Sequence, residues 1–278
     1  MTSMDYQIER VGIIGKPSDW LIASVPPDIV LNKLKNFEFI NIPIQDLYKI
    51  YDEVLPKADG KLLRSFSISN KNINSKELQK SEAFYLALKK LVKENNLTAL
   101  TIRCFDLLNE YQTTGCFALS KLNDEGIIAG CEGDIVSLIG MITAVRKTGK
   151  QVWMANPSQI DVEKSQLILA HCTVPTCITK KVELDTHFES NQGIGLIGKM
   201  KETDITIFRL GGINLDKKFV CSGKTIPHKH NPNLCRTQIK VQIDENNSLN
   251  KLLTNPLGNH LLVFFGKHTD ILNDFQRN

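Results

Sequence analysis

The first half of the chain alternates short apolar runs with segments of helical periodicity. Residues 11–15, "VGIIG", and 37–43, "FEFINIP", have the continuous apolar character of short buried strands. Residues 75–96 carry apolar side chains at helical spacing behind Ser75, which predicts a long helix capped by that serine. The pattern therefore begins as strand, strand, helix.

The same alternation continues to about residue 150. A buried strand is predicted at 97–105, a helix at about 113–122, a strand at 126–131 and a helix at 134–146. Strands and helices that alternate with short turns form a parallel sheet covered by helices. We therefore predict an α/β, Rossmann-like domain with a parallel sheet over residues 1–150.

After residue 150 the pattern changes to strand-like segments separated by glycine, proline and asparagine. Few helical patterns intervene, and such a series of short strands is typical of an antiparallel sheet or barrel. We predict a mainly antiparallel, barrel-like β domain over residues 151–278. Its expected strands lie at 166–172, 177–188, 204–213, 236–243 and 260–265.

Composition and charge narrow the class of protein. The net charge of +4 comes from 34 basic and 30 acidic residues without a run of one sign, which argues against a nucleic-acid-binding surface. The chain has neither an apolar leader nor a stretch long enough to cross a membrane. Seven cysteines, including Cys104, Cys131 and Cys172 in apolar runs, indicate reduced, buried thiols. We expect a cytoplasmic protein that binds neither nucleic acid nor membrane.

A glycine pattern resembles a nucleotide-binding motif but lacks its context. Gly193, Gly195 and Gly198 have the G-x-G-x-x-G spacing, which requires a helix immediately afterwards to bind the pyrophosphate. A strand follows instead. A glycine-rich hairpin is therefore the preferred interpretation.

Two histidine- and cysteine-containing segments also suggest binding chemistry. Residues 221–235, "CSGKTIPHKHNPNLC", match no standard zinc module, so an exposed loop is expected there rather than a structural zinc site. His171 and Cys172 end an apolar strand, where neighbouring side chains point to opposite faces. We expect Cys172 to lie in the core and His171 to face a cleft.

Residues 127–139, "IIAGCEGDIVSLI", carry the strongest candidate for chemistry. Glu132 and Asp134 fall between a predicted strand and a predicted helix, where acids commonly cap the helix. Asp134 fits the cap position, whereas Glu132 lies one step too early. Ligands bind beyond the carboxyl ends of parallel strands, so Glu132 is the better candidate for a functional group.

This segment and several others together resemble the L-fucose isomerase family. The main matching segments are 130–142, "GCEGDIVSLIGMI", 152–161, "VWMANPSQID", and 258–272, "GNHLLVFFGKHTDIL". The resemblance covers nearly the whole chain in the same order and is strongest to the shorter archaeal and bacterial relatives. It implies a Rossmann-like domain followed by a β-rich domain, in agreement with the residue pattern. Further matches are "VGIIGKPSDWLIAS", "ILAHCTVP" and "THFESNQGIGLIG".

The resemblance also implies a manganese site. In the family a glutamate, an aspartate and a histidine bind Mn²⁺, and the corresponding residues here are Glu132, Asn156 and His260. Glu132 and His260 are the implied catalytic residues, and Asn259 and His171 are expected to contact the substrate. Asparagine replaces the family aspartate, which removes one negative charge, so we expect weak binding of the ion.

The implied activity is aldose–ketose isomerisation of an open-chain sugar or sugar derivative. In this reaction a metal polarises the carbonyl while a carboxylate moves a proton between adjacent carbons through an enediol. The alternative is a non-catalytic sugar-binding or regulatory protein on a degenerate isomerase scaffold. Relative to the family, we expect the chain to lack an additional N-terminal domain and to form a homo-oligomer, a trimer or hexamer.

Overall fold

A four-stranded parallel sheet forms the centre of the first half of the chain. The computed structural model describes residues 8–245 and 248–273. Neighbouring strands run parallel in the order β2-β1-β4-β5, as the alternating pattern predicts. All four residues of β4 are buried, as expected for a strand covered on both faces. The strands are β1 (Glu9–Ile14), β2 (Phe37–Ile42), β4 (Ala99–Ile102) and β5 (Ile128–Gly130).

Helices cover this sheet. The three predicted helices are present near their expected positions as α3, α5 and α6, whereas α1, α2 and α4 were not predicted. The long helix is capped by Asn74, whose side chain accepts hydrogen bonds from the backbone N–H groups of Lys76 and Glu77, so the expectation of a cap at Ser75 is wrong by one residue. The helices are α1 (Asp28–Leu31), α2 (Ile44–Val54), α3 (Ser75–Glu94), α4 (Asp106–Tyr111), α5 (Cys116–Asp124) and α6 (Ile135–Thr148), with short 3₁₀ turns η1 (Leu55–Lys57) and η2 (Lys61–Leu63).

A closed six-stranded barrel forms most of the second half and confirms the predicted barrel-like β architecture. Its strands follow the order β10-β11-β12-β7-β6-β13, and all neighbours that pair are antiparallel. The strand β11 is not predicted, because Phe219 is its one large apolar residue at a buried position and the other buried positions are Cys221, Gly223 and Thr225. The strands are β6 (Val152–Asp161), β7 (Gln166–His171), β10 (Asp204–Gly211), β11 (Lys217–Ile226), β12 (Thr237–Ile243) and β13 (Leu261–Phe265).

A small third sheet joins the two halves. β3 (Ser67–Ile68), which comes from the first half, pairs in parallel with β8 (Lys181–Asp185), and β8 pairs antiparallel with β9 (Gly195–Lys199). The glycine pattern thus lies largely in β9 and is followed by strand β10, so no helix begins where a dinucleotide would require one. The remaining elements are η3 (Thr176–Ile178), α7 (Ser248–Thr254) and α8 (Thr269–Asn273).

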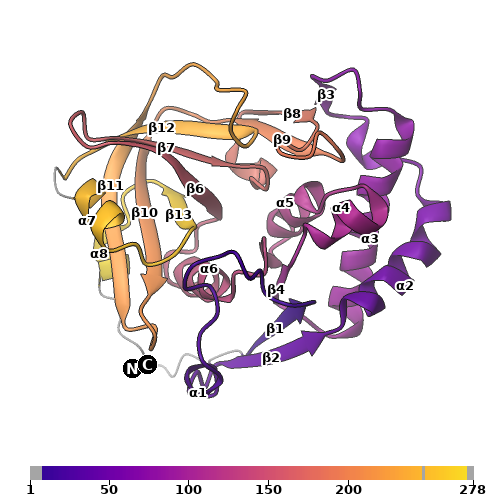
Figure 1. Cartoon of the computed structure of the whole chain (residues 1–278), viewed down its shortest axis with the longest axis horizontal. Coiled ribbons are helices and arrows are strands. Elements are labelled where there is room, and N and C mark those ends of the chain that lie inside the picture. The colour runs from indigo at the N-terminus through magenta and orange to yellow at the C-terminus, as the bar shows by residue number, and fades with distance from the viewer. Residues whose placement is uncertain (1–7, 246–247, 274–278) are drawn as a thin grey trace.

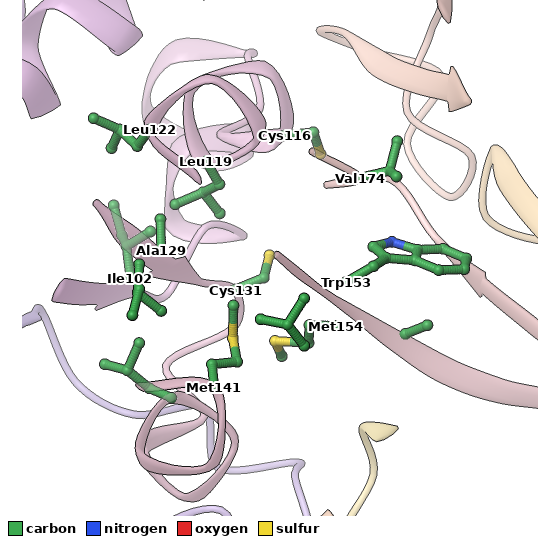
Figure 2. Packing of buried hydrophobic residues seen from close by; sticks show 14 of the residues in the cluster. Ile102, Cys116, Leu119, Leu122, Ala129, Cys131, Met141, Trp153, Met154 and Val174 are labelled. Atoms are coloured by element: carbon green, nitrogen blue, oxygen red, sulfur yellow. The ribbon is translucent and has the colours of Figure 1, made fainter. Parts of the chain in front are cut away.

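Helix α6 lies between the parallel sheet and the barrel (Figure 1). It packs on β4 and β5 on one side and on β6, β10 and β13 on the other. The buried side chains of both halves form one continuous hydrophobic cluster. Figure 2 shows Ile102 of the sheet on one side and Trp153 of β6 on the other, with Cys131 between them. None of the described helices is both long and apolar enough to cross a membrane.

The contact between α6 and the barrel predicts that Gly140→Leu destabilises the fold. A Cβ atom at Gly140 would lie 2.9 Å from Cδ1 of Leu262, which is itself fully buried. Overpacking of this kind costs about 1–3 kcal/mol in the free energy of unfolding, which denaturant titration measures. Thr143→Val on the same helix is the control, because its side chain is only half-buried. Equal stability of Gly140→Leu and the parent protein would contradict this packing.

Candidate active site

The turn after β5 carries a glutamate in an uncommon backbone conformation. Glu132 and Gly133 both have left-handed backbones, with φ of 60° and 68°. A non-glycine residue rarely adopts this conformation, and it is often found at functional sites. Gly133 is required at its position, because a Cβ atom there would lie 2.8 Å from Cα of Pro17. The turn is therefore held against the segment that follows β1.

Glu132 lines a cavity of about 470 Å³ at the carboxyl end of the parallel sheet, where α/β proteins bind ligands. The cavity wall combines residues from both halves of the chain. Its described lining contains two glutamates but no lysine or arginine. The lining residues are Trp20, Leu21, Cys104, Phe105, Cys116, Cys131, Glu132, Asn156, His171, Cys172, His187, Glu189, Cys235 and Asn259.

Asp134 caps helix α6, as its sequence position predicts. Its Oδ1 accepts a hydrogen bond of 2.8 Å from the backbone N–H of Ser137, and its Oδ2 accepts one of 2.7 Å from the Ser137 hydroxyl. The carboxylate is fully buried. A buried charge of this kind needs a partner of opposite sign.

Arg209 of β10 is that partner. Its Nη1 lies 3.2 Å from Oδ2 of Asp134, and its Nη2 donates to the carbonyl of Ala23 at 3.4 Å. Burial by itself raises the pKa of Asp134, but the charge of Arg209, followed by His260 and Ser137, outweighs it and lowers this pKa to about 2. The carboxylate therefore remains ionised at neutral pH.

Asp134 also orients His260, which precedes β13. Nδ1 of His260 lies 2.9 Å from Oδ2 of Asp134, so Nδ1 donates and Nε2 points toward Glu132. Nε2 is buried, lies 3.4 Å from Oε1 of Glu132 and has no hydrogen-bond partner among the described residues. Burial lowers the pKa of His260, but the hydrogen bond to Asp134 and the negative charges of Glu132 and Asp134 raise it to about 9.

His171, at the end of β7, faces Glu132 from the other side. Its Nδ1 accepts a hydrogen bond of 3.0 Å from the backbone N–H of Cys172, so the proton of the neutral ring lies on Nε2. Nε2 is 3.7 Å from Oε1 of Glu132 and is also buried without a partner. The two imidazoles thus have different roles. Nε2 of His171 offers a hydrogen-bond donor, whereas Nε2 of His260 offers a lone pair only when a cation replaces its proton.

The two histidines determine the charge state of Glu132. Burial opposes ionisation, but the close polar contacts with His171 and His260 and the positive charge of His260 hold the pKa of Glu132 well below its ordinary value. The indole Nε1 of Trp20 donates to Oε2 of Glu132 at 3.3 Å. Glu132 is therefore an ionised carboxylate that faces the cavity.

The structure places the two predicted asparagines beside the same cavity. Asn156 lines it from β6, one residue after Ala155, which pairs with Leu261. This register brings Asn156 next to His260. Asn259 also lines the cavity, and its Oδ1 accepts a hydrogen bond of 2.6 Å from the backbone N–H of Ile22. That oxygen holds the segment after β1 against the cavity mouth.

The five residues predicted from the sequence thus lie together, although they come from four separate segments. One cavity is lined by Glu132, Asn156, His171 and Asn259. His260 is not part of the lining but contacts Glu132 directly. Trp20 and Arg209 were not identified from the sequence. The sequence did contain a signal for Arg209, because it is the one charged residue within the apolar run of β10 and a buried guanidinium needs a carboxylate partner.

The donor atoms around Glu132 fit a hard divalent cation such as Mn²⁺. A carboxylate and an amide oxygen are hard ligands, and imidazole nitrogen is also a common ligand for such ions. The separation of 3.4 Å between Oε1 of Glu132 and Nε2 of His260 is close to the spacing of about 3 Å between adjacent ligands of one ion. The contact of His260 with Asp134 is the outer interaction that ligating histidines usually make.

Comparison with known proteins finds sugar isomerases at low identity. The chain is 24% identical over 177 residues to a sulfoquinovose isomerase of Alkalicoccus urumqiensis, covering 60% of this chain and 40% of that protein. It is 28% identical over 133 residues to one of Clostridium sp. (strain MSTE9), covering 46% and 30%. A sulfoquinovose isomerase of Priestia aryabhattai is 22% identical over 213 residues, covering 72% and 47%. No family model matches the chain.

These matches show that the chain is similar in sequence to sulfoquinovose isomerases and that it spans less than half the length of these relatives. They agree with the part of the sequence-based resemblance that implies a sugar isomerase. The narrower assignment to the L-fucose isomerase family stays a prediction.

The buried position of Asp134 predicts a large loss of stability for Asp134→Asn. The substitution leaves the guanidinium of Arg209 buried without a counter-charge, which costs about 3–5 kcal/mol in the free energy of unfolding. Asp106→Asn is the matched control, because its pair with Arg103 is partly exposed and contributes about 1 kcal/mol or less. Denaturant titration of both variants measures the difference. Similar small losses for both would contradict the role of Asp134.

Proposed function

We propose that this chain is the catalytic part of an aldose–ketose isomerase that acts on an open-chain sugar or sugar derivative. One observation carries the proposal. The ionised carboxylate of Glu132 lies close to Nε2 of His171 and Nε2 of His260, neither of which has a hydrogen-bond partner, beside a cavity of about 470 Å³. Sequence similarity to sulfoquinovose isomerases supports the same reaction class.

Each side chain has a role in this proposal. Glu132 is deprotonated throughout the physiological pH range and accepts the proton that leaves the sugar carbon. His171 donates a hydrogen bond from Nε2 to a sugar oxygen. Glu132, Asn156 and His260 would hold a manganese ion, which supplies polarisation of the sugar carbonyl and so acidifies the adjacent C–H bond. The low pKa makes Glu132 a weak base, so this acidification is needed.

The cavity wall favours a neutral sugar over a negatively charged one. A sulfonate group usually binds to arginine, lysine or a helix N-terminus, whereas the described lining contains no lysine or arginine and two glutamates, Glu132 and Glu189. Sulfoquinovose is a sulfonated sugar, so the proposed substrate differs in charge from that named for the relatives. Trp20 and Phe105 give the wall the apolar surface on which a sugar ring face or carbon chain packs.

The rival proposal is a non-catalytic sugar-binding or regulatory protein on the same scaffold. The neutral side chain of Asn156 favours this rival function. The resemblance implies an aspartate at that position, so the cation site has one negative charge fewer than in the family and should bind an ion more weakly. In either case we propose a homo-oligomer, in which a second subunit covers the exposed apolar side chains of Trp20 and Ile22 beside the cavity.

A substrate screen with a Glu132 variant separates these two functions. The purified chain is incubated with Mn²⁺ and a panel of neutral aldoses and sulfoquinovose, and ketose formation is measured by chromatography. We expect turnover of a neutral aldose and a loss of at least about a hundredfold in Glu132→Gln, because the variant cannot accept the proton. Glu163→Gln, on the exposed turn between β6 and β7, should retain activity. Sugar binding without turnover would support the rival function.

A second prediction concerns the asparagine. Asn156→Asp should tighten Mn²⁺ binding by about tenfold or more, because it adds a carboxylate ligand of opposite charge. Calorimetric titration of the parent protein and the variant measures the change. Asn255→Asp, at an exposed site, is the control for the added charge alone. Equal affinities of the parent protein and Asn156→Asp would show that Asn156 does not contact the ion.

A further inference from the structure

A second set of potential ligands lines the same cavity as Glu132 but consists mainly of thiols. Cys116 is the first residue of α5, Cys172 directly follows β7, His187 lies between β8 and β9, and Cys235 precedes β12. All four line the cavity. None of the cysteines forms a disulfide, and Cys116 and Cys172 are buried.

Three of the four side chains are close enough to share one metal ion, and the fourth, Cys235, lines the same cavity. The Sγ atoms of Cys116 and Cys172 and a ring nitrogen of His187 all lie within 4.8 Å of one another. The thiol of Cys235 is near enough to the thiol of Cys172 for the two groups to influence each other's pKa. Adjacent sulfur ligands of a tetrahedral zinc ion are about 3.8 Å apart, so Cys116, Cys172 and His187 need only small side-chain movements, and Cys235 would move closer to complete the set.

The surroundings of His187 suit a ligating histidine. Its Nδ1 lies 3.2 Å from Oγ of Ser190, an outer contact that holds the ring and leaves Nε2 for a metal. The backbone N–H of His187 donates to the carbonyl of Gln192 at 3.0 Å, and its carbonyl accepts from Asn191 at 2.9 Å. The loop that carries His187 is therefore held by its own hydrogen bonds.

The chemistry of these ligands differs from that around Glu132. Three thiols and an imidazole select zinc or another soft ion, whereas carboxylate, amide and imidazole groups suit manganese. Three cysteines and one histidine also make a complete tetrahedral set, which is the pattern of structural zinc sites.

We propose that Cys116, Cys172, Cys235 and His187 form a Cys₃His zinc site, separate from the cation site at Glu132. The ion links α5 of the first half to the barrel and to the small sheet. Cys172 directly follows His171, so the zinc fixes the wall of the proposed active site that carries His171. Cys131, next to Glu132, lines the same cavity but is not one of the zinc ligands. The sequence segment 221–235 thus contributes Cys235 alone to this site, and Cys221 lies buried in β11.

Elemental analysis of the purified full chain tests the proposal. After reconstitution with equal zinc and manganese and removal of free metal, we expect one zinc ion per chain. Cys116→Ser and Cys235→Ser should lose this zinc, whereas Cys177→Ser, at an exposed cysteine outside the cavity, should keep it. Zinc that persists in the thiol variants but disappears in Glu132→Gln would overturn the proposal.

Alkylation of the parent protein gives a test that does not depend on the folding of a variant. Bound zinc should protect Cys116, Cys172 and Cys235 from iodoacetamide, and a chelator should expose them, while Cys177 should react in both cases. Peptide mass spectrometry identifies the labelled residues. Labelling that does not depend on the chelator, or a disulfide between any two of the three cavity cysteines, would also overturn the proposal.

Discussion

The buried carboxylate of Asp134 is the interaction on which the arrangement of the site depends. It caps α6, pairs with Arg209 of the barrel and orients His260 before β13. Arg209 in turn binds the carbonyl of Ala23, which holds the segment after β1. One ionised group therefore joins four parts of the chain that are distant in sequence. Because Glu132 lies only two residues earlier, the same group also fixes the position of the proposed catalytic carboxylate.

The sequence predicts the parts of this arrangement that depend on local patterns. The parallel sheet, the barrel and the cap at Asp134 follow from apolar periodicity and from the turn at Gly133. The cap of α3 was predicted at Ser75 but is Asn74. Both are good capping residues, and only the backbone geometry distinguishes them. Local patterns therefore give the elements and most of their ends.

Groupings that arise from the topology could not be predicted in this way. Cys116, Cys172, His187 and Cys235 come from four segments, and no spacing along the chain indicates that they line one cavity. Glu132, Asn156 and His260 were grouped only through the resemblance to L-fucose isomerases. A residue pattern alone identified Glu132, because it follows a buried strand at the edge where parallel sheets bind ligands.

Charge balance explains why the neutral side chain of Asn156 matters for the cation site. Asp134 is neutralised by Arg209 at 3.2 Å, so it contributes little net charge to an ion near Glu132. Glu132 is then the main source of negative potential, and its carboxylate already faces His260, which is protonated at neutral pH until a cation replaces the proton. An aspartate at position 156 would add a second unpaired negative charge beside His260. We therefore expect the affinity of the proposed site for a divalent cation to depend on position 156 more than on Asp134, and the stability of the fold to depend more on Asp134.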